Sequence, residues 1–344
     1  MESRAEEPSA PALRRRGKAE PDVAVSGRGC KNSSVLEADE LPEWAHRYTY
    51  ITSGYRDPAL HNSWILCLTS IFKWHTETVN ILLHLLGSLY ALGLLFWVLT
   101  LATFQQGSPV AKLCSVRNLL AHRPPPRPPS PPAPRALNAN ILSARPRLQC
   151  YLQVTVCLGS FAVQFCSTVA HTFHVLSPVS NKLMWRLDYV AMSSLFLSAE
   201  LSQNWIVLGV YSPLAFWCVQ AAFLTTTAVI MWQIWTKERY GLIGIIAVWG
   251  LVPQGIYMAY LAYGPGGGDP NLVAITFYAL AGTGFAAGGC LMYALHIPER
   301  WMPGRLNYVG NSHNFLHLGV PFSTTFALLG CQYIAAWEQS VWNK

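Results

Sequence analysis

The sequence predicts an all-α integral membrane protein, a seven-transmembrane helical bundle with a cytosolic N-terminus and an extracellular or luminal C-terminus. Of the 344 residues, 52% are hydrophobic and only 12% are charged, whereas about 25% is usual for a soluble domain. Seven apolar runs approach or exceed the roughly 20 residues that cross a bilayer. Lys and Arg gather in alternate loops between these runs. The composition excludes a soluble enzyme, a disordered chain and a disulfide-stapled secreted module.

Two stretches precede the first apolar run. Residues 1–40 are rich in Pro, Ala, Glu and Arg, which predicts a disordered cytosolic tail. Residues 41–77 mix aromatic and basic side chains without a run of spanning length. Within them, residues 58–72 are expected to lie along the inner interface as an amphipathic helix. A solvated linker is the alternative for this segment.

The membrane domain is expected over residues 78–336, with a short C-terminal tail at 337–344. The third run is the weakest, because Glu200, Gln203 and Asn204 interrupt it, and six spans remain the alternative. The seven runs lie at about 78–104, 150–174, 189–209, 214–235, 241–263, 272–296 and 315–336.

The loop charges predict the orientation. The loops after the second, fourth and sixth runs carry basic side chains, and the two loops on the opposite side, 210–213 and 264–271, carry none. Lys and Arg prefer the cytosolic side, so the N-terminus is expected in the cytosol, the reverse of a G-protein-coupled receptor. The basic, Pro-rich loop 105–149 fits neither side and is interpreted as a disordered insertion or a gene-model artefact. The basic residues in the cytosolic loops are Lys182, Arg186, Lys237, Arg239, Arg300 and Arg305.

Polar side chains within the spans fall at one depth. Spans 1, 3 and 7 begin and span 2 ends on the same side of the membrane, so the polar groups there all lie just inside the cytosolic leaflet. Ionisable groups inside a membrane are costly, and each is therefore a functional candidate. In chain order these residues are Glu77, Asn80, His84, Ser167, His171, Asp188, His313 and His317.

Three of these histidines suggest a catalytic zinc site. His171, His313 and His317 would supply three neutral imidazole ligands and leave a fourth position open. Asp188 is interpreted as the general base, and Ser167, one turn before His171, as a hydrogen-bond donor that supports the site. The alternative is that the paired histidines of the seventh span are only structural.

Three of the polar residues named above lie at the start of the first span. Glu77, Asn80 and His84 are spaced three and four residues apart, which places them on one helical face. They are interpreted as a hydrogen-bonded brace that locks the first span against its neighbours, in preference to a catalytic role.

These motifs resemble the progestin and adipoQ receptor family over residues 41–318, apart from the insertion at 105–149. His75-Thr76-Glu77-Thr78 is similar to the adiponectin receptors, and Leu306-Asn307-Tyr308 to the Golgi member that traps Raf kinase. Asn314 departs from the usual Gln of the family. The motifs that carry the resemblance are Glu77-x2-Asn80-x3-His84, Ser167-x3-His171, Leu187-Asp188-Tyr189, Ile297-Pro298-Glu299-Arg300-x2-Pro303-Gly304 and Ser312-His313-x3-His317.

The resemblance implies seven spans, a cytosolic N-terminus and zinc held by His171, His313 and His317. It leaves three function classes. The first is a receptor for a lipid or hormone of adiponectin or ceramide type that hydrolyses a lipid amide through zinc. The second is a Golgi scaffold whose residues 1–74 hold a Raf-type kinase or another cytosolic signalling protein. The third is a progestin-type steroid receptor. The lipid bilayer of the plasma membrane or the Golgi is the expected surrounding, and no nucleic-acid partner is expected.

Overall fold

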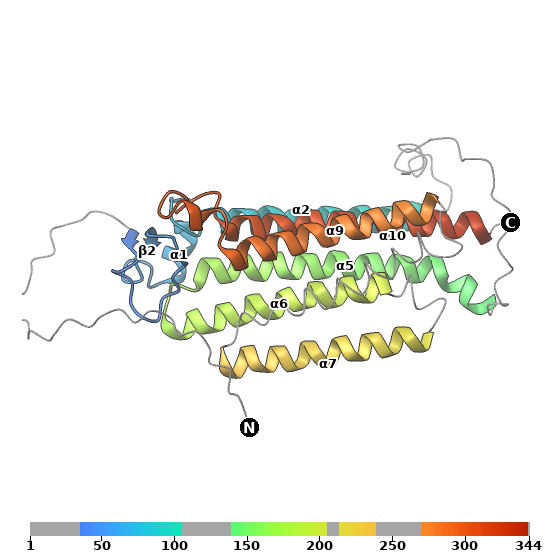
Figure 1. Ribbon diagram of the computed structural model, residues 1–344, viewed down its shortest axis with the longest axis horizontal. Coiled ribbons are helices and arrows are strands. Elements are labelled where there is room, and N and C mark those ends of the chain that lie inside the picture. The colour runs from blue at the N-terminus through green and yellow to red at the C-terminus, as the bar shows by residue number, and fades with distance from the viewer. Residues whose placement is uncertain (1–34, 105–138, 205–212, 239–269, 343–344) are drawn as a thin grey trace, which may run out of the picture. The chain divides into compact units, whose positions relative to one another are not determined.

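The computed structural model describes residues 35–104, 139–204, 213–238 and 270–342 (Figure 1). The predicted tail up to residue 34, the loop core at 105–138 and the predicted fifth span at 241–263 lie outside these residues. The described part is mostly helical and includes seven α-helices. They are α1 (Trp64–Ser70), α2 (Thr78–Phe104), α5 (Ala139–Phe173), α6 (Pro178–Asn204), α7 (Pro213–Lys237), α9 (Pro270–Leu295) and α10 (Ser312–Trp342).

Four of the described helices are long and apolar enough to cross a membrane. They coincide with the predicted first, second, fourth and sixth spans. The helices α6 and α10 lie at the predicted third and seventh spans, and α6 is the more polar of these two segments because it includes Lys182, Arg186, Asp188 and Glu200. The chain is a multi-pass integral membrane protein, and its sidedness stays a prediction. The four candidate spans are Thr78–Thr100, Tyr151–Phe173, Phe216–Lys237 and Phe277–Trp301.

The loop predicted over residues 105–149 ends earlier than expected. Helix α5 begins at Ala139, so the last part of the predicted loop is helical and leads directly into the second span. Residues 139–145 read Ala-Asn-Ile-Leu-Ser-Ala-Arg, and Ala, Leu and Arg are strong helix formers.

The segment before α2 is folded around a small two-stranded sheet. Strand β1 (Val35–Glu37) pairs antiparallel with β2 (Ser53–Arg56), and a bulge lies between Leu36 and Glu37. Leu41, Ile51 and Tyr55 form the buried cluster beneath this sheet. The strand β1 thus covers residues near the end of the predicted disordered tail.

Helix α1 is shorter than the amphipathic helix expected over residues 58–72. It begins after Ser63, whose hydroxyl accepts a hydrogen bond from the backbone N–H of Leu66 at 3.3 Å, as an N-cap residue does. The residues before it form a turn in which the Asp57 carbonyl accepts from the N–H groups of Leu60 and His61. Ile65 is 72% exposed, so the helix presents an apolar side of the kind that lies in a membrane interface.

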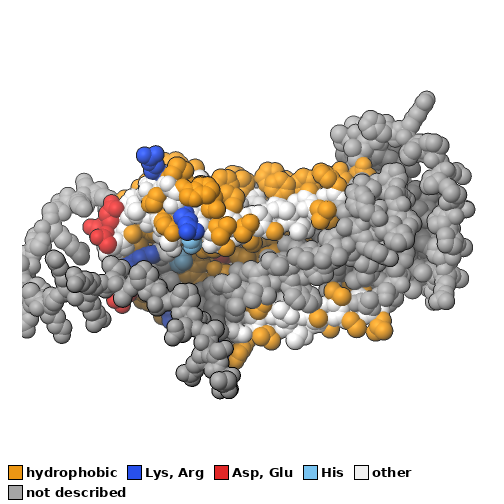
Figure 2. Space-filling view, in the orientation of Figure 1, with side chains coloured by type: hydrophobic (Ala, Val, Ile, Leu, Met, Phe, Trp, Pro, Cys, Tyr) orange, Lys and Arg blue, Asp and Glu red, His pale blue; other side chains and the backbone are white. Residues whose placement is uncertain are grey.

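The long helices pack as neighbours along their length (Figure 1). Helix α5 packs against α2 on one side and α6 on the other, and α10 packs against α9 and also contacts α2, α5 and α6. Hydrophobic side chains cover much of the outer surface of these helices (Figure 2). Apolar residues that face outward are expected where the solvent is lipid, because no hydrophobic effect drives them inward there.

Replacing Gly319 by Ala is expected to destabilise the contact between α9 and α10. A Cβ atom at Gly319 would lie 2.7 Å from the carbonyl oxygen of Phe285, so the two helix backbones would have to move apart. Overpacking of this kind costs about 1–3 kcal/mol. Thermal unfolding in detergent should show a lower Tm than the wild type. Gly288→Ala on α9 is the matched control, because its Cβ atom meets nothing within 4 Å; an equal Tm for both variants would contradict the prediction.

Candidate metal centre

The first turn of α10 is held firmly by two side chains. Asn311 accepts a hydrogen bond from the backbone N–H of Asn314 at 3.1 Å, and Glu299 accepts one from the N–H of Ser312 at 2.7 Å. The Ser312 hydroxyl also donates to Glu299. These acceptors satisfy N–H groups that a helix N-terminus leaves unpaired, and the carboxylate complements the positive end of the helix dipole. The turn that includes His313 is therefore well fixed.

Four histidines from three helices form one buried cluster. His84 comes from α2, His171 from α5, and His313 and His317 from α10, and each is 6% exposed or less. The ring centroids of His84 and His317 lie 3.9 Å apart, and those of His171 lie 5.0 Å from His317 and 5.1 Å from His313. The cluster thus includes all three histidines predicted as ligands, together with His84.

The nitrogen atoms of this cluster suit a metal ion. His84, His171 and His317 each offer one ligand atom, and these atoms lie within 4.8 Å of one another. Among the described residues, the Nε2 atoms of these three side chains and Nδ1 of His313 have no hydrogen-bond partner. A buried polar atom without a partner costs about 1–3 kcal/mol, which metal coordination would offset. Neutral imidazoles are common ligands of zinc and other transition metals, so the donor set fits a metal ion.

Glu77 connects this cluster to the N-terminal segment. Its carboxylate accepts hydrogen bonds from Nδ1 of His171 at 2.8 Å, from the Asn80 amide at 2.9 Å and from the Tyr48 hydroxyl at 2.6 Å. A carboxylate on the far nitrogen of a metal-binding histidine fixes its tautomer and ring orientation. The three residues of the predicted brace do not form one hydrogen-bonded group. Glu77 and Asn80 bond to each other, whereas His84 bonds to Gln164.

A second connection runs from α2 to α10. The Asn314 amide donates to Oδ1 of Asn80 at 2.6 Å, and Oδ1 of Asn314 accepts from the backbone N–H of Gly310 at 2.8 Å. Asn314, which departs from the usual residue of the family, therefore has partners on both sides. Together with the bond between Asn80 and Glu77, this pair joins the two helices that carry His84 and His317.

The predicted base and its donor do come together. The hydroxyl of Ser167 on α5 donates a hydrogen bond to Oδ1 of Asp188 on α6, and both side chains are buried. Asp188 also lies near enough to His171 for an electrostatic interaction. The structure thus places a buried carboxylate near His171, and its role as general base stays a prediction.

Sequence reasoning missed three residues that support the site. Gln164 lies seven residues before His171, a spacing that places both on one face of α5, so a signal was present. Tyr48 and Arg56 come from the N-terminal segment, and no spacing rule connects them to the spans. Arg56 donates to the carbonyl oxygens of His171 at 2.5 Å and Thr172 at 2.8 Å, which the end of α5 leaves without helical partners.

His75 holds the backbone at the entry to α2. Its Nδ1 atom accepts from the N–H of Glu77 at 3.1 Å, and its Nε2 atom lies 3.1 Å from the carbonyl oxygen of Ser70. Burial lowers the pKa of His75 to about 3, so the imidazole is neutral at pH 7 and can accept at one nitrogen while it donates at the other. This arrangement positions Glu77.

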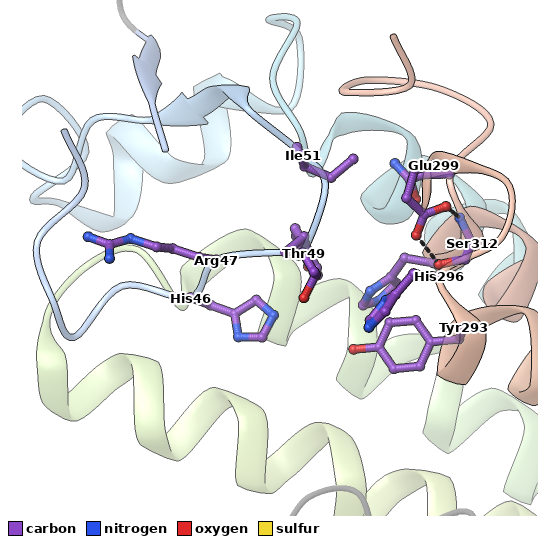
Figure 3. A pocket seen from close by; sticks show the side chains of 11 residues that line it. His46, Arg47, Thr49, Ile51, Tyr293, His296, Glu299 and Ser312 are labelled. Carbon is purple, nitrogen blue, oxygen red and sulfur yellow. Dashed lines mark hydrogen bonds between the residues drawn. The ribbon is translucent and has the colours of Figure 1, made fainter. Parts of the chain in front are cut away.

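A cavity of about 140 Å³ lies next to His313 (Figure 3). Residues 46–49 and Ile51 of the N-terminal segment line one wall, and Tyr293, His296, Glu299 and Ser312 contribute to the other. The ring of His46 and the hydroxyl of Tyr293 extend into the space between the walls. The cavity has room for several water molecules beside the cluster.

The chain is similar to several known proteins. A family model described as haemolysin-III related matches residues 72–328. An uncharacterized protein of Schizosaccharomyces pombe is 28% identical over 86% of this chain and 59% of its own length. The adiponectin receptor protein of Drosophila melanogaster is 23% identical over 83% and 56%, so the chain spans less than two thirds of either relative. Progestin and adipoQ receptor family member 3 of Homo sapiens is 26% identical over 81% and 79%.

Proposed function

The chain belongs to the haemolysin-III related family, and we propose that it hydrolyses a lipid amide, of the ceramide type, at a zinc site within the membrane. The family match also confirms the resemblance to the progestin and adipoQ receptors. The proposed zinc ligands are His171, His313 and His317, although the three nitrogens that lie within 4.8 Å of one another belong to His84, His171 and His317. The proposal includes a receptor role in which binding of a lipid or hormone controls the site.

One observation carries this proposal. Four buried imidazole nitrogens without hydrogen-bond partners in the described structure gather beside the buried pair of Ser167 and Asp188. A purely structural cluster would be expected to satisfy these nitrogens with protein donors or acceptors. Open lone pairs next to a buried carboxylate are the arrangement expected of a metal-assisted hydrolase.

Asp188, Ser167 and Glu77 would each have a separate role beside a bound zinc ion. A bound zinc ion would supply a Lewis acid that polarises the amide carbonyl and lowers the pKa of water. Ser167 occupies one carboxylate oxygen of Asp188, which leaves the other oxygen to take a proton from the attacking water. Glu77 keeps the Nδ1 proton of His171 in place, so the Nε2 lone pair faces the cluster.

The surroundings of the cluster suit an amphiphilic substrate. The helices on which it lies are apolar on their outer faces, and a lipid would approach through the membrane. The cavity beside His313 is lined by polar groups that include Tyr48, Tyr293 and His296. A polar headgroup or the water needed for hydrolysis would fit there. The cytosolic N-terminus and a location in the plasma membrane or Golgi are part of the same proposal.

Metal analysis of the purified protein tests the proposal. We expect about one zinc ion per chain in the wild type, as at a mononuclear catalytic site, and almost none in the double variant His313→Ala with His317→Ala. His296→Ala is the matched control, because His296 lines the cavity without belonging to the cluster, and it should retain zinc. A wild type without zinc would refute the proposed chemistry.

A further inference from the structure

Tyr48 in the N-terminal segment contacts the surroundings of two proposed ligands. Its hydroxyl donates a hydrogen bond to Oε1 of Glu77 at 2.6 Å, and Oε2 of the same carboxylate accepts from Nδ1 of His171 at 2.8 Å. The centroid of its ring lies 5.0 Å from that of His313, at an interplanar angle of 80°. The two histidines belong to different helices, α5 and α10. One side chain therefore contacts both the carboxylate that holds His171 and the ring of His313.

The neighbours of Tyr48 in the segment fix its position. Its backbone N–H donates to the hydroxyl of Tyr55 at 3.0 Å, and that hydroxyl donates to the carbonyl oxygen of Ile51 at 3.1 Å. Tyr55 belongs to β2 and is buried. Burial and the carboxylate of Glu77 raise the pKa of Tyr48 well above its usual value. The hydroxyl of Tyr48 therefore keeps its proton and remains a hydrogen-bond donor.

The same segment is anchored to two other parts of the protein. The backbone N–H of Thr52 donates to Oδ1 of Asn307 at 3.1 Å, and the Asn307 amide donates to the Ser53 hydroxyl at 2.6 Å. At the end of α5, Arg56 donates to the carbonyl oxygen of Thr172 at 2.8 Å. Asn307 precedes α10 by a few residues, so the segment joins the beginning of α10 to the end of α5, the two helices that carry the proposed ligands.

We propose that Tyr48 is a positioning residue for His171 and His313, through which docking of the N-terminal segment and binding of the metal ion favour each other. The inference rests on the metal site of the proposed function. The hydroxyl of Tyr48 holds the carboxylate that sets the tautomer of His171, and its ring limits how the imidazole of His313 can rotate. Because such coupling is reciprocal, loosening the segment weakens metal binding, and bound metal tightens the segment by the same factor.

Metal affinity and spectroscopy test the role of Tyr48. The purified full-length protein is stripped with a chelator and titrated with Co²⁺, whose visible absorption reports the geometry of its ligands. Tyr48→Leu removes the hydroxyl and the ring, so it is expected to weaken Co²⁺ binding about 10–100-fold and to change the spectrum. Tyr48→Phe keeps the ring and should show a smaller loss. Tyr50→Phe removes a hydroxyl from the same segment and should match the wild type. Wild-type affinity and spectrum in Tyr48→Leu would overturn the inference.

Amide hydrogen exchange tests the opposite direction of the coupling. In the wild type, Co²⁺ should slow exchange of the backbone N–H groups of Tyr48 and Thr52, which bond to Tyr55 and Asn307. The expected change is about 10-fold or more, because it equals the factor by which docking strengthens metal binding. The same measurement in Tyr48→Leu should show a much smaller change. Exchange in the wild type that is unaffected by bound Co²⁺ would contradict the proposed coupling.

Gly54→Ala tests whether the segment acts from a distance. Gly54 has a φ of +91°, and a Cβ atom there would lie 2.7 Å from the ring of Tyr308, so the variant should loosen the segment without changing a side chain of the cluster. Co²⁺ binding should weaken, whereas Gly93→Ala on α2, whose Cβ atom meets nothing within 4 Å, should bind as the wild type does. Wild-type affinity in Gly54→Ala would overturn the inference alone. A wild type that binds no metal would overturn the proposed function itself.

Discussion

Asp188→Asn is expected to abolish lipid-amide turnover while the metal content stays at the wild-type level. The amide has the shape of the carboxylate and keeps an oxygen for the Ser167 hydroxyl, but it cannot take a proton. Loss of a general base typically costs 10²- to 10⁴-fold in rate, or about 3–5 kcal/mol in the activation barrier. The measurement is kcat for a ceramide with a labelled acyl chain, alongside zinc analysis of the same preparation.

Asp57→Asn is a suitable control for this change. Asp57 lies outside the site, and its Oδ1 atom accepts from the backbone N–H of Ala59 at 2.9 Å, a bond that Asn can keep. Turnover and zinc content should both match the wild type. If Asp188→Asn retains wild-type turnover, Asp188 is not the base and the hydrolase proposal loses its proton acceptor.

Glu77→Leu is expected to destabilise the fold and to weaken metal binding together. The change leaves Nδ1 of His171, the Asn80 amide and the Tyr48 hydroxyl without their acceptor. Removing one partner from a buried charged network typically costs about 3–5 kcal/mol, and loss of a supporting carboxylate weakens metal affinity about 10–100-fold. Thermal unfolding in detergent and chelator competition measure the two effects.

Two comparisons separate the causes of this loss. Glu77→Gln keeps one acceptor oxygen, so it should lie between the wild type and Glu77→Leu in both measurements. Glu43→Gln removes a carboxylate that is exposed in the N-terminal segment and should change neither. A wild-type Tm and metal affinity in Glu77→Leu would show that the network does not support the site.

Hydropathy predicted the membrane helices well and their ends less well. Four predicted spans coincide with apolar helices of sufficient length, because an apolar run needs no tertiary contact to be recognised. The start of α5 at Ala139 and the short α1 were missed. Helix ends depend on caps such as Ser63 and on turns such as that at Asp57, which composition does not reveal.

The sequence predicted the membrane depth at which the polar residues lie. It did not predict which of them form hydrogen bonds with one another. Alternating spans place His84, His171 and His317 at one level whatever the rotation of each helix. The bonds from Glu77 to His171 and from Gln164 to His84 join different helices, and they depend on which faces meet. Tyr48 and Arg56 enter from a segment whose path over the helix ends has no sequence signal.

The amino-acid sequence by itself determined the class of protein, four of its spans and the level at which its polar residues meet, because these follow from hydropathy and from the helical repeat. Only the tertiary structure decided that His84 joins the histidine cluster and that Glu77 and Gln164 each hold one imidazole. Such contacts require helices to approach closely at particular rotations. The absence of a side chain at Gly87 leaves space for the Gln164 amide, and its absence at Gly319 lets the backbone of Phe285 come close. The sequence pattern alone does not say which neighbour will occupy such a space.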